Sequence, residues 1–275
     1  NDRRPDRAVL VYSNMIRRFF KGTQKKIVIS GIESSLRRIT HYDYWSNKLR
    51  KPILFDAKAD ILSYGMGEMS MLALARALRH GKDWKDIRGL SYISREPRED
   101  YLNLPSHAEC LESKDTFTEA FHQFYFNCDP ITAKGLCQKC DDRYLIQNPP
   151  SMTYTEEEMD AIYSMEFARD VHPYYKAMGA VRALDTIRYS VTTHRGCYGE
   201  CNFCAIAIHQ GRTVMSRSQS SIVEEVGEIT KLPKFKGNIS DVGGPTANMY
   251  ALECKKKLKL GSCPDRRCLY PRKCP

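Results

Sequence analysis

Short apolar runs bounded by polar residues are the first pattern along the chain. Residues 8–12 (Ala-Val-Leu-Val-Tyr) and 26–30 (Lys-Ile-Val-Ile-Ser) have this form, which is typical of buried strands in a parallel sheet. Residues 14–21, between them, have helical spacing. We therefore predict a strand, a helix and a second strand at the start of the chain.

A third strand is predicted at residues 59–64. It turns through Gly65-Met-Gly-Glu68 into a helix at 69–79, and another apolar segment follows at 86–92. The apolar side of the helix is predicted to consist of Met71, Leu72, Leu74, Ala75 and Leu78. Strands that alternate with helices are typical of an α/β fold with a parallel sheet.

The alternation is lost between residues 93 and 180, where several prolines interrupt the chain. Residues 116–126 have helical spacing and are rich in aromatic side chains. Residues 153–159 (Thr-Tyr-Thr-Glu-Glu-Glu-Met) have the form of a helix start, because acidic residues favour the positive end of a helix.

The strand and helix pattern returns near residue 187. A strand is predicted at 187–193, a helix from Ser221 with a Ser221/Glu224 capping box, and a strand at 237–242 that leads into Gly243 and Gly244. The buried stripe of this helix is predicted to be Ile222, Val223, Val226 and Ile229.

Composition limits the class of protein. The 275 residues are 42% hydrophobic with a mean hydropathy of −0.51, enough for a core but without a run of eighteen apolar residues that would span a membrane. No secretory signal is visible. The sequence starts at Asn1, without Met, in a polar stretch, so we expect a fragment of a longer protein.

The eleven cysteines are an odd number and are clustered, which favours ligation over a disulfide scaffold and predicts a cytoplasmic location. The net charge of +10 includes a basic run at residues 255–259. A basic surface can contact nucleic acid, but such a run is more often a solvated face, so we do not favour nucleic acid as a partner.

Cys197, Cys201 and Cys204 are the main candidate for chemistry. They follow a predicted strand with a Cys-x3-Cys-x2-Cys spacing. Three thiolates can hold three irons of a [4Fe-4S] cluster and leave the fourth iron open to another molecule. The alternatives are a zinc site with a remote fourth ligand or thiols that share a loop by chance.

This loop resembles the Cys-x3-Cys-x-(aromatic)-Cys motif of radical S-adenosylmethionine (SAM) enzymes, with Phe203 at the aromatic position. The resemblance implies a [4Fe-4S] cluster on these cysteines and SAM on the open iron. It also implies reductive cleavage of SAM to a 5′-deoxyadenosyl radical that abstracts hydrogen from a substrate, with a reductant such as flavodoxin or ferredoxin. Phe203 is then expected beside the adenine.

Gly243 and Gly244 stand where radical SAM proteins have a glycine pair beside the SAM amino group. Glycine suits such a position because it has no Cβ atom. Pro245 departs from the Glu that often follows, so the match is one of position. An ordinary tight turn is the alternative.

Two longer segments resemble the uncharacterised YgiQ-like radical SAM proteins. They are residues 31–45 (Gly-Ile-Glu-Ser-Ser-Leu-Arg-Arg-Ile-Thr-His-Tyr-Asp-Tyr-Trp) and 241–250 (Asp-Val-Gly-Gly-Pro-Thr-Ala-Asn-Met-Tyr). The first segment is predicted either to face substrate or another domain, or to pack its rings into the core. Its polar and aromatic members are Glu33, Arg37, Arg38, Tyr42, Tyr44 and Trp45.

The resemblance also implies a fold and a domain organisation. Residues 1–105 are expected to form an incomplete Rossmann-like, cobalamin-binding-like domain, and 106–180 an irregular or helical connection. Residues 181–275 are expected to begin the partial TIM barrel of a radical SAM core, with a cysteine-rich tail. No Asp-x-His-x-x-Gly motif for cobalt is present, so cobalamin is not expected. We expect the core to be truncated, so that the chain by itself can be inactive.

Two further cysteine groups remain. Four thiols near the C-terminus resemble a cysteine-rich insert of YgiQ-like proteins and are predicted to hold zinc or a second cluster; these are Cys254, Cys263, Cys268 and Cys274. The middle group is predicted to consist of free thiols rather than a metal site; its members are Cys110, Cys128, Cys137 and Cys140.

Two functions therefore follow from the sequence. The first is a radical SAM iron–sulfur enzyme whose substrate the sequence does not define. The alternative is a zinc-stabilised basic scaffold or nucleic-acid-binding protein. Iron or zinc in the purified protein distinguishes them.

Overall fold

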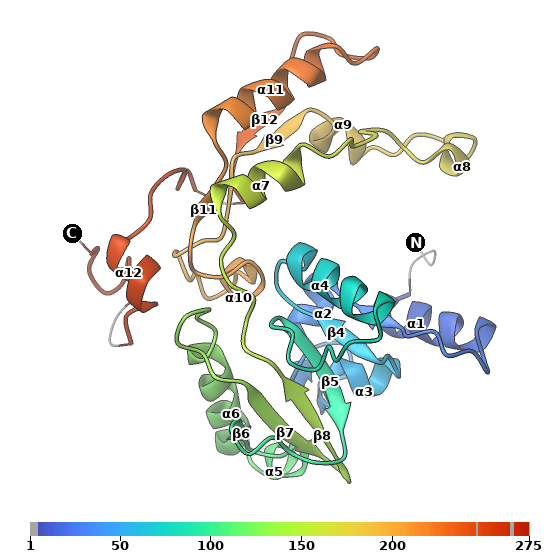
Figure 1. The fold of residues 1–275 in the computed structure, drawn as a ribbon, viewed down its shortest axis with the longest axis vertical. Coiled ribbons are helices and arrows are strands. Elements are labelled where there is room, and N and C mark those ends of the chain that lie inside the picture. Colours follow the sequence, from blue (N-terminus) through green and yellow to red (C-terminus); the bar gives the residue numbers. More distant parts are fainter. Residues whose placement is uncertain (1–4, 246, 265–266, 275) are drawn as a thin grey trace.

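A computed structural model describes residues 5–245, 247–264 and 267–274. Figure 1 shows two lobes. The sheet lobe, residues 5–150, is the lower part of that view, and the cysteine lobe, residues 151–274, forms the upper and left parts. No helix in the described residues has the length and apolar character that crossing a membrane requires.

Six strands of the sheet lobe form one mixed sheet. In sheet order they are β1 (Val28–Ile29), β4 (Ile61–Ser63), β5 (Leu90–Ser94), β8 (Arg143–Gln147), β7 (Leu136–Cys140) and β6 (Leu102–Leu104). The two outer pairs are parallel and the three inner pairs antiparallel. The α/β class is confirmed, but the expectation of a parallel sheet is wrong for its centre.

The hairpin of β7 and β8 accounts for one of the three antiparallel pairs. The two strands are joined through Asp141 and Asp142, with Asp141 at φ 57°, and so short a turn can join only antiparallel strands. The prediction of irregular or helical structure is therefore wrong for this part of residues 106–180. The strand β7 was not predicted because it contains the polar residue Gln138, which interrupts the apolar pattern. Gln138 is buried, and its side-chain oxygen accepts a hydrogen bond from Thr40 N at 2.8 Å. The proposed domain limits stay predictions.

The first predicted strand is also wrong, because residues 8–12 belong to helix α1 (Ala8–Phe19). Val9, Leu10 and Ser13 face the protein interior at helical spacing, while Val11 and Tyr12 are exposed. A short apolar run is compatible with either a strand or a helix, and its length does not decide between them.

The other elements of the sheet lobe are α2 (Gly31–Leu36), β2 (His41–Asp43), β3 (Lys48–Arg50), α3 (Ile53–Ala57), α4 (Glu68–Arg79), α5 (His107–Glu112) and α6 (Lys114–Phe126). The helices predicted at 69–79 and 116–126 are thus confirmed as α4 and α6. The buried face of α4 is narrower than predicted, because Leu74 is buried but Leu72 and Leu78 are exposed.

The cysteine lobe contains α7 (Glu156–Tyr163), α8 (Pro173–Lys176), α9 (Leu184–Ile187), β9 (Ser190–Thr192), β10 (His194–Arg195), α10 (Ile206–His209), β11 (Met215–Ser216), α11 (Gln219–Thr230), β12 (Asp241–Gly243) and α12 (Lys255–Leu260). The helix start predicted within residues 153–159 is confirmed, and Thr155 forms a capping box with Glu158 at the start of α7.

Helix α11 differs from its prediction at the N-terminus and along its stripe. Ser218, rather than Ser221, is the N-cap, and its hydroxyl accepts from Ser221 N at 3.1 Å. Of the predicted stripe, Ile229 is buried while Val223 is 68% exposed; the helix packs against β9 and α7.

The segment 31–45 contains one buried cation and several exposed rings. Arg38 is 1% exposed, whereas Tyr44 and Trp45 are 80% and 64% exposed. The guanidinium lies between the rings of Tyr64 and Phe124, with its Cζ atom 4.5 and 4.4 Å from the ring centroids. Packing of the segment's own rings into the core is therefore the wrong interpretation.

Candidate functional site

A cleft of about 640 Å³ lies between the two lobes. On the sheet lobe it is lined where two neighbouring strands end, by Ser30 and Gly31 after β1 and by residues 65–68 after β4. On the cysteine lobe it is lined by β9, by Gly243 at the end of β12 and by Gly244 directly after it. The carboxyl ends of adjacent parallel strands are a common position for a ligand in an α/β protein.

The cysteine loop comprises residues 197–204. In the sequence it is flanked by Arg195 and His209, and both of these residues line the cleft. It starts with a close backbone approach: Gly196 has φ 86°, and a Cβ atom there would lie 2.0 Å from the Thr213 carbonyl oxygen. Only glycine fits this position without a shift of the neighbouring strand. The sequence analysis did not identify Gly196 as part of the site.

The three predicted ligands share this loop but differ in exposure. Cys197 is buried, Cys204 is half-buried and Cys201 is exposed. Within residues 5–245, 247–264 and 267–274, no three His, Cys, Asp or Glu side chains are arranged to hold a metal ion. Phe203, predicted to lie beside the adenine, is 94% exposed.

The chemistry of the loop nevertheless fits an iron–sulfur cluster. The Gly199 amide donates to Cys197 Sγ at 3.3 Å, and N–H groups directed at sulfur tune such clusters. A Cβ atom on Gly199 would lie 3.2 Å from Cys197 Sγ and 3.8 Å from Cys201 Sγ. Glycine therefore leaves space beside two of the three sulfurs.

Gly244 is required to be glycine by its close approach to His194. A Cβ atom there would lie 2.1 Å from the His194 ring, so the strand end can approach the buried imidazole only without a side chain. Gly243 pairs with Thr192, and its carbonyl accepts from Thr193 N at 2.8 Å. The predicted contact of these glycines with SAM stays a prediction.

Polar contacts join the two lobes on both sides of the cysteine loop. Before it, Arg195 Nη1 donates to Glu68 Oε1 at 2.6 Å. After it, His209 Nδ1 lies 3.0 Å from Ser35 Oγ. Tyr154 adds a hydroxyl that donates to the Met66 carbonyl at 2.8 Å and to Glu68 Oε2 at 3.1 Å.

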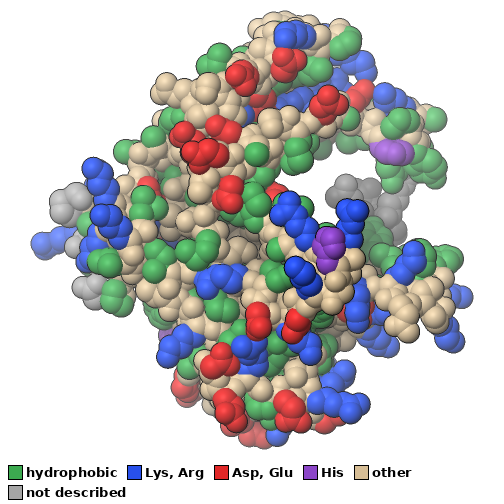
Figure 2. Space-filling view, in the orientation of Figure 1, with side chains coloured by type: hydrophobic (Ala, Val, Ile, Leu, Met, Phe, Trp, Pro, Cys, Tyr) green, Lys and Arg blue, Asp and Glu red, His purple; other side chains and the backbone are tan. Residues whose placement is uncertain are grey.

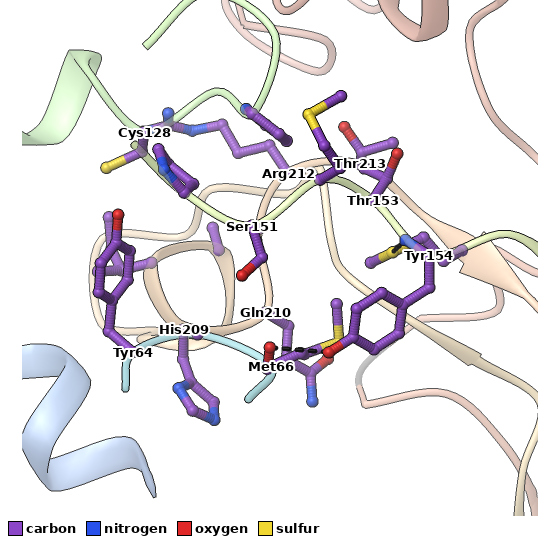
Figure 3. Close-up of a pocket in the computed structure, with 18 of the residues that line it drawn as sticks. Tyr64, Met66, Cys128, Ser151, Thr153, Tyr154, His209, Gln210, Arg212 and Thr213 are labelled. Carbon is purple, nitrogen blue, oxygen red and sulfur yellow. Dashed lines mark hydrogen bonds between the residues drawn. The ribbon is translucent and has the colours of Figure 1, made fainter. Parts of the chain in front are cut away.

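Figure 3 shows the small pocket, about 60 Å³, beside these contacts. Tyr64 and Met66 reach it from the sheet lobe, and Tyr154 and His209 from the cysteine lobe. The dashed line marks the hydrogen bond of the Tyr154 hydroxyl to Met66. The cysteine loop is therefore flanked in the sequence by two residues that contact the sheet lobe, Arg195 and His209.

Comparison with known proteins identifies the family. A family model described as radical SAM N-terminal matches residues 1–190. The chain belongs to the radical SAM N-terminal family. The cysteine loop lies beyond the matched residues, so its ligand role is not part of this match.

Relatives of this chain confirm its resemblance to YgiQ-like proteins. A UPF0313 protein of Fusobacterium nucleatum subsp. nucleatum is 85% identical over 274 residues, which cover 100% of this chain and 48% of that protein. A UPF0313 protein of Methanocella arvoryzae is 48% identical, covering 99% of this chain and 46% of the relative. The chain spans about half the length of the curated relatives it matches.

A solved structure has a weak similarity to this radical SAM family member. It is a radical SAM methyltransferase, TsrM, from Kitasatospora setae with cobalamin and a [4Fe-4S] cluster bound. The TM-score is 0.41 at 15% identity, over 80% of this chain and 31% of the other. That this chain binds no cobalamin stays a prediction.

The remaining cysteines of the chain lie in the sheet lobe and in the C-terminal tail. Cys137 and Cys140 are buried on β7, while Cys128 Sγ lies 4.0 Å from an Arg38 nitrogen, so these thiols do not converge. None of the four cysteines of the middle group forms a disulfide, and their being free thiols rather than metal ligands stays a prediction. In the tail, Cys274 N donates to the Cys268 carbonyl at 2.8 Å, and burial raises the pKa of the Cys268 thiol.

The contact between Glu68 and Arg195 is expected to make stability depend on pH. Burial alone raises the pKa of Glu68, but the hydrogen bond and positive charge of Arg195 outweigh it, so the net pKa is below 4.5. A lowered carboxylate pKa adds stability above the unfolded-state pKa, and this stability is lost as pH falls through the folded-state pKa.

Glu68→Gln should therefore destabilise the protein near neutral pH, and the difference in its free energy of unfolding from wild type should narrow below about pH 4.5. Urea unfolding of both proteins across this range measures it; a difference that does not vary with pH would contradict the ionic contact.

Proposed function

We propose that the protein containing this chain is a radical SAM enzyme. In this proposal Cys197, Cys201 and Cys204 hold a [4Fe-4S] cluster, while Gly243 and Gly244 lie near the SAM amino group and Phe203 near the adenine. The observation that carries the proposal is the position of the segment that contains the cysteine loop. It leaves β9, whose parallel neighbour β12 leads into the glycine pair, and the residues on either side of the loop, Arg195 and His209, line the cleft.

The bound cluster would supply the electron that cleaves SAM to a 5′-deoxyadenosyl radical, which abstracts hydrogen from the substrate. The residues of this chain position the reactants. Glu68 of the sheet lobe lines the cleft and binds Arg195 and Tyr154 of the cysteine lobe, so these contacts hold the two sides of the cleft together. A flavodoxin or ferredoxin is the proposed reductant, and the proposed location is the cytoplasm.

The tail cysteines are proposed as a second metal site, for zinc or a second cluster, because thiolates suit both. Their numbers are Cys254, Cys263, Cys268 and Cys274.

Figure 2 is relevant to the nucleic-acid alternative. On the face that it shows, Lys and Arg side chains are interspersed with Asp and Glu, without a continuous basic surface. That face offers no extended contact for a phosphate backbone.

The experiment is performed on the whole protein, purified without oxygen. We expect about four irons per cluster and, with SAM and dithionite, formation of 5′-deoxyadenosine, measured by mass spectrometry. Zinc alone, with no 5′-deoxyadenosine, would overturn the proposal and support the scaffold.

A further inference from the structure

Glu200 has an unusual backbone conformation within the cysteine loop. It lies directly before Cys201 and has φ 49°, in the left-handed region that glycine occupies readily and other residues seldom do. Its side chain is 9% exposed. A buried carboxylate on a disfavoured turn requires partners that compensate both costs.

Two partners come from different parts of the protein. Arg212 Nε donates to Glu200 Oε1 at 2.6 Å, and the Tyr125 hydroxyl donates to the same oxygen at 2.9 Å. Arg212 comes shortly after the loop in the cysteine lobe, whereas Tyr125 lies on α6 of the sheet lobe.

The partners also hold each other. Arg212 Nη2 donates to the Tyr125 carbonyl at 3.1 Å, and its Cζ atom lies 4.3 Å from the centroid of the Tyr125 ring. The carboxylate, the guanidinium and the phenol thus form one connected unit, in which each member limits the movement of the others.

We propose that Glu200 is a positioning residue for the cluster-binding loop, held by Arg212 and Tyr125. The proposal rests on the proposed function, because it assumes a cluster on Cys197 and Cys201. Glu200 fixes the turn between these two ligands, and Tyr125 makes that turn depend on contact with the sheet lobe. Removal of the carboxylate would also leave the Arg212 charge without its counter-ion, which would favour the reduced cluster because reduction adds a negative charge.

Glu200→Gln and Tyr125→Phe in the whole reconstituted protein test this role. The first variant keeps the side-chain size and removes the charge; the second removes one hydroxyl and keeps the ring against Arg212. For Glu200→Gln we expect iron loss to a chelator to be faster by about tenfold, as is typical when partners of metal ligands are changed. Its reduction potential should become more positive. Tyr125→Phe should also lose iron faster, by a smaller factor.

Glu224→Gln is the matched control. Glu224 is an exposed carboxylate on α11, so its loss removes the same charge from the same lobe and should change neither iron loss nor potential. If wild-type protein holds no iron, the proposed function fails. If wild type holds iron and both test variants match it in iron loss and potential, this inference alone is overturned. If Glu200→Gln does not fold, Tyr125→Phe decides.

Discussion

Substitution of Cys201 by alanine in the whole protein is expected to abolish the iron–sulfur absorbance and to reduce 5′-deoxyadenosine formation to background. Three thiolates are the only protein ligands proposed for the cluster, and two are not expected to retain it. Cys201 is exposed, so its removal leaves no cavity, and the stability of the cluster-free variant should differ from that of the cluster-free wild type by less than about 0.5 kcal/mol. A large loss of cofactor with little loss of stability separates a ligand from a structural cysteine.

Cys128→Ser is the control for this prediction. Cys128 is half-buried, its thiol donates to the Phe124 carbonyl, and a serine hydroxyl can make the same bond. Absorbance at visible wavelengths, iron content and thermal unfolding are measured on both variants. Retention of full cluster absorbance by Cys201→Ala would remove Cys201 from the ligand set.

Arg38→Ala should lower the free energy of unfolding by roughly 3–5 kcal/mol, the largest stability effect that we expect from a single residue. The Arg38 side chain is 1% exposed. Its Nε atom donates to Gln147 Oε1 at 3.0 Å, and Nη1 donates to the Ser35 carbonyl. Alanine would leave both acceptors without this donor and a cavity between Tyr64 and Phe124.

Two comparison variants separate the contribution of the Arg38 hydrogen bonds to the free energy of unfolding from that of its volume and from the general effect of removing an arginine. Arg38→Met fills most of the volume but donates no hydrogen bond, so its destabilisation should lie between those of wild type and Arg38→Ala. Arg79→Ala changes an exposed arginine at the end of α4 and should stay within about 0.5 kcal/mol of wild type. Urea unfolding measures all three; equal stability of Arg38→Ala and Arg79→Ala would contradict the predicted role.

The sequence was sufficient where the signal is local. The helix start predicted within residues 153–159 is confirmed at Thr155, because the cap and the acidic first turn are neighbours in the sequence. The helices α4 and α6 are confirmed for a similar reason, because helical spacing depends on neighbouring positions. The family was also predictable, since it rests on strings of adjacent residues such as 31–45.

The sequence was not sufficient where strands and side chains pair across long separations. The antiparallel centre of the sheet requires β7 and β8, and the buried Gln138 hides the apolar pattern of β7. In α1, periodicity did not separate a helix from a strand, and packing of Val9 and Leu10 against the core selects the helix.

For the candidate site, the sequence by itself determined which thiols share the loop, because their spacing is covalent. Only the tertiary structure decided what surrounds that loop. Glu68 and Arg195 meet across 127 positions, and Tyr125 and Glu200 across 75. No local pattern marks such partners, because their contact depends on how the two lobes pack and not on the residues next to them in the chain.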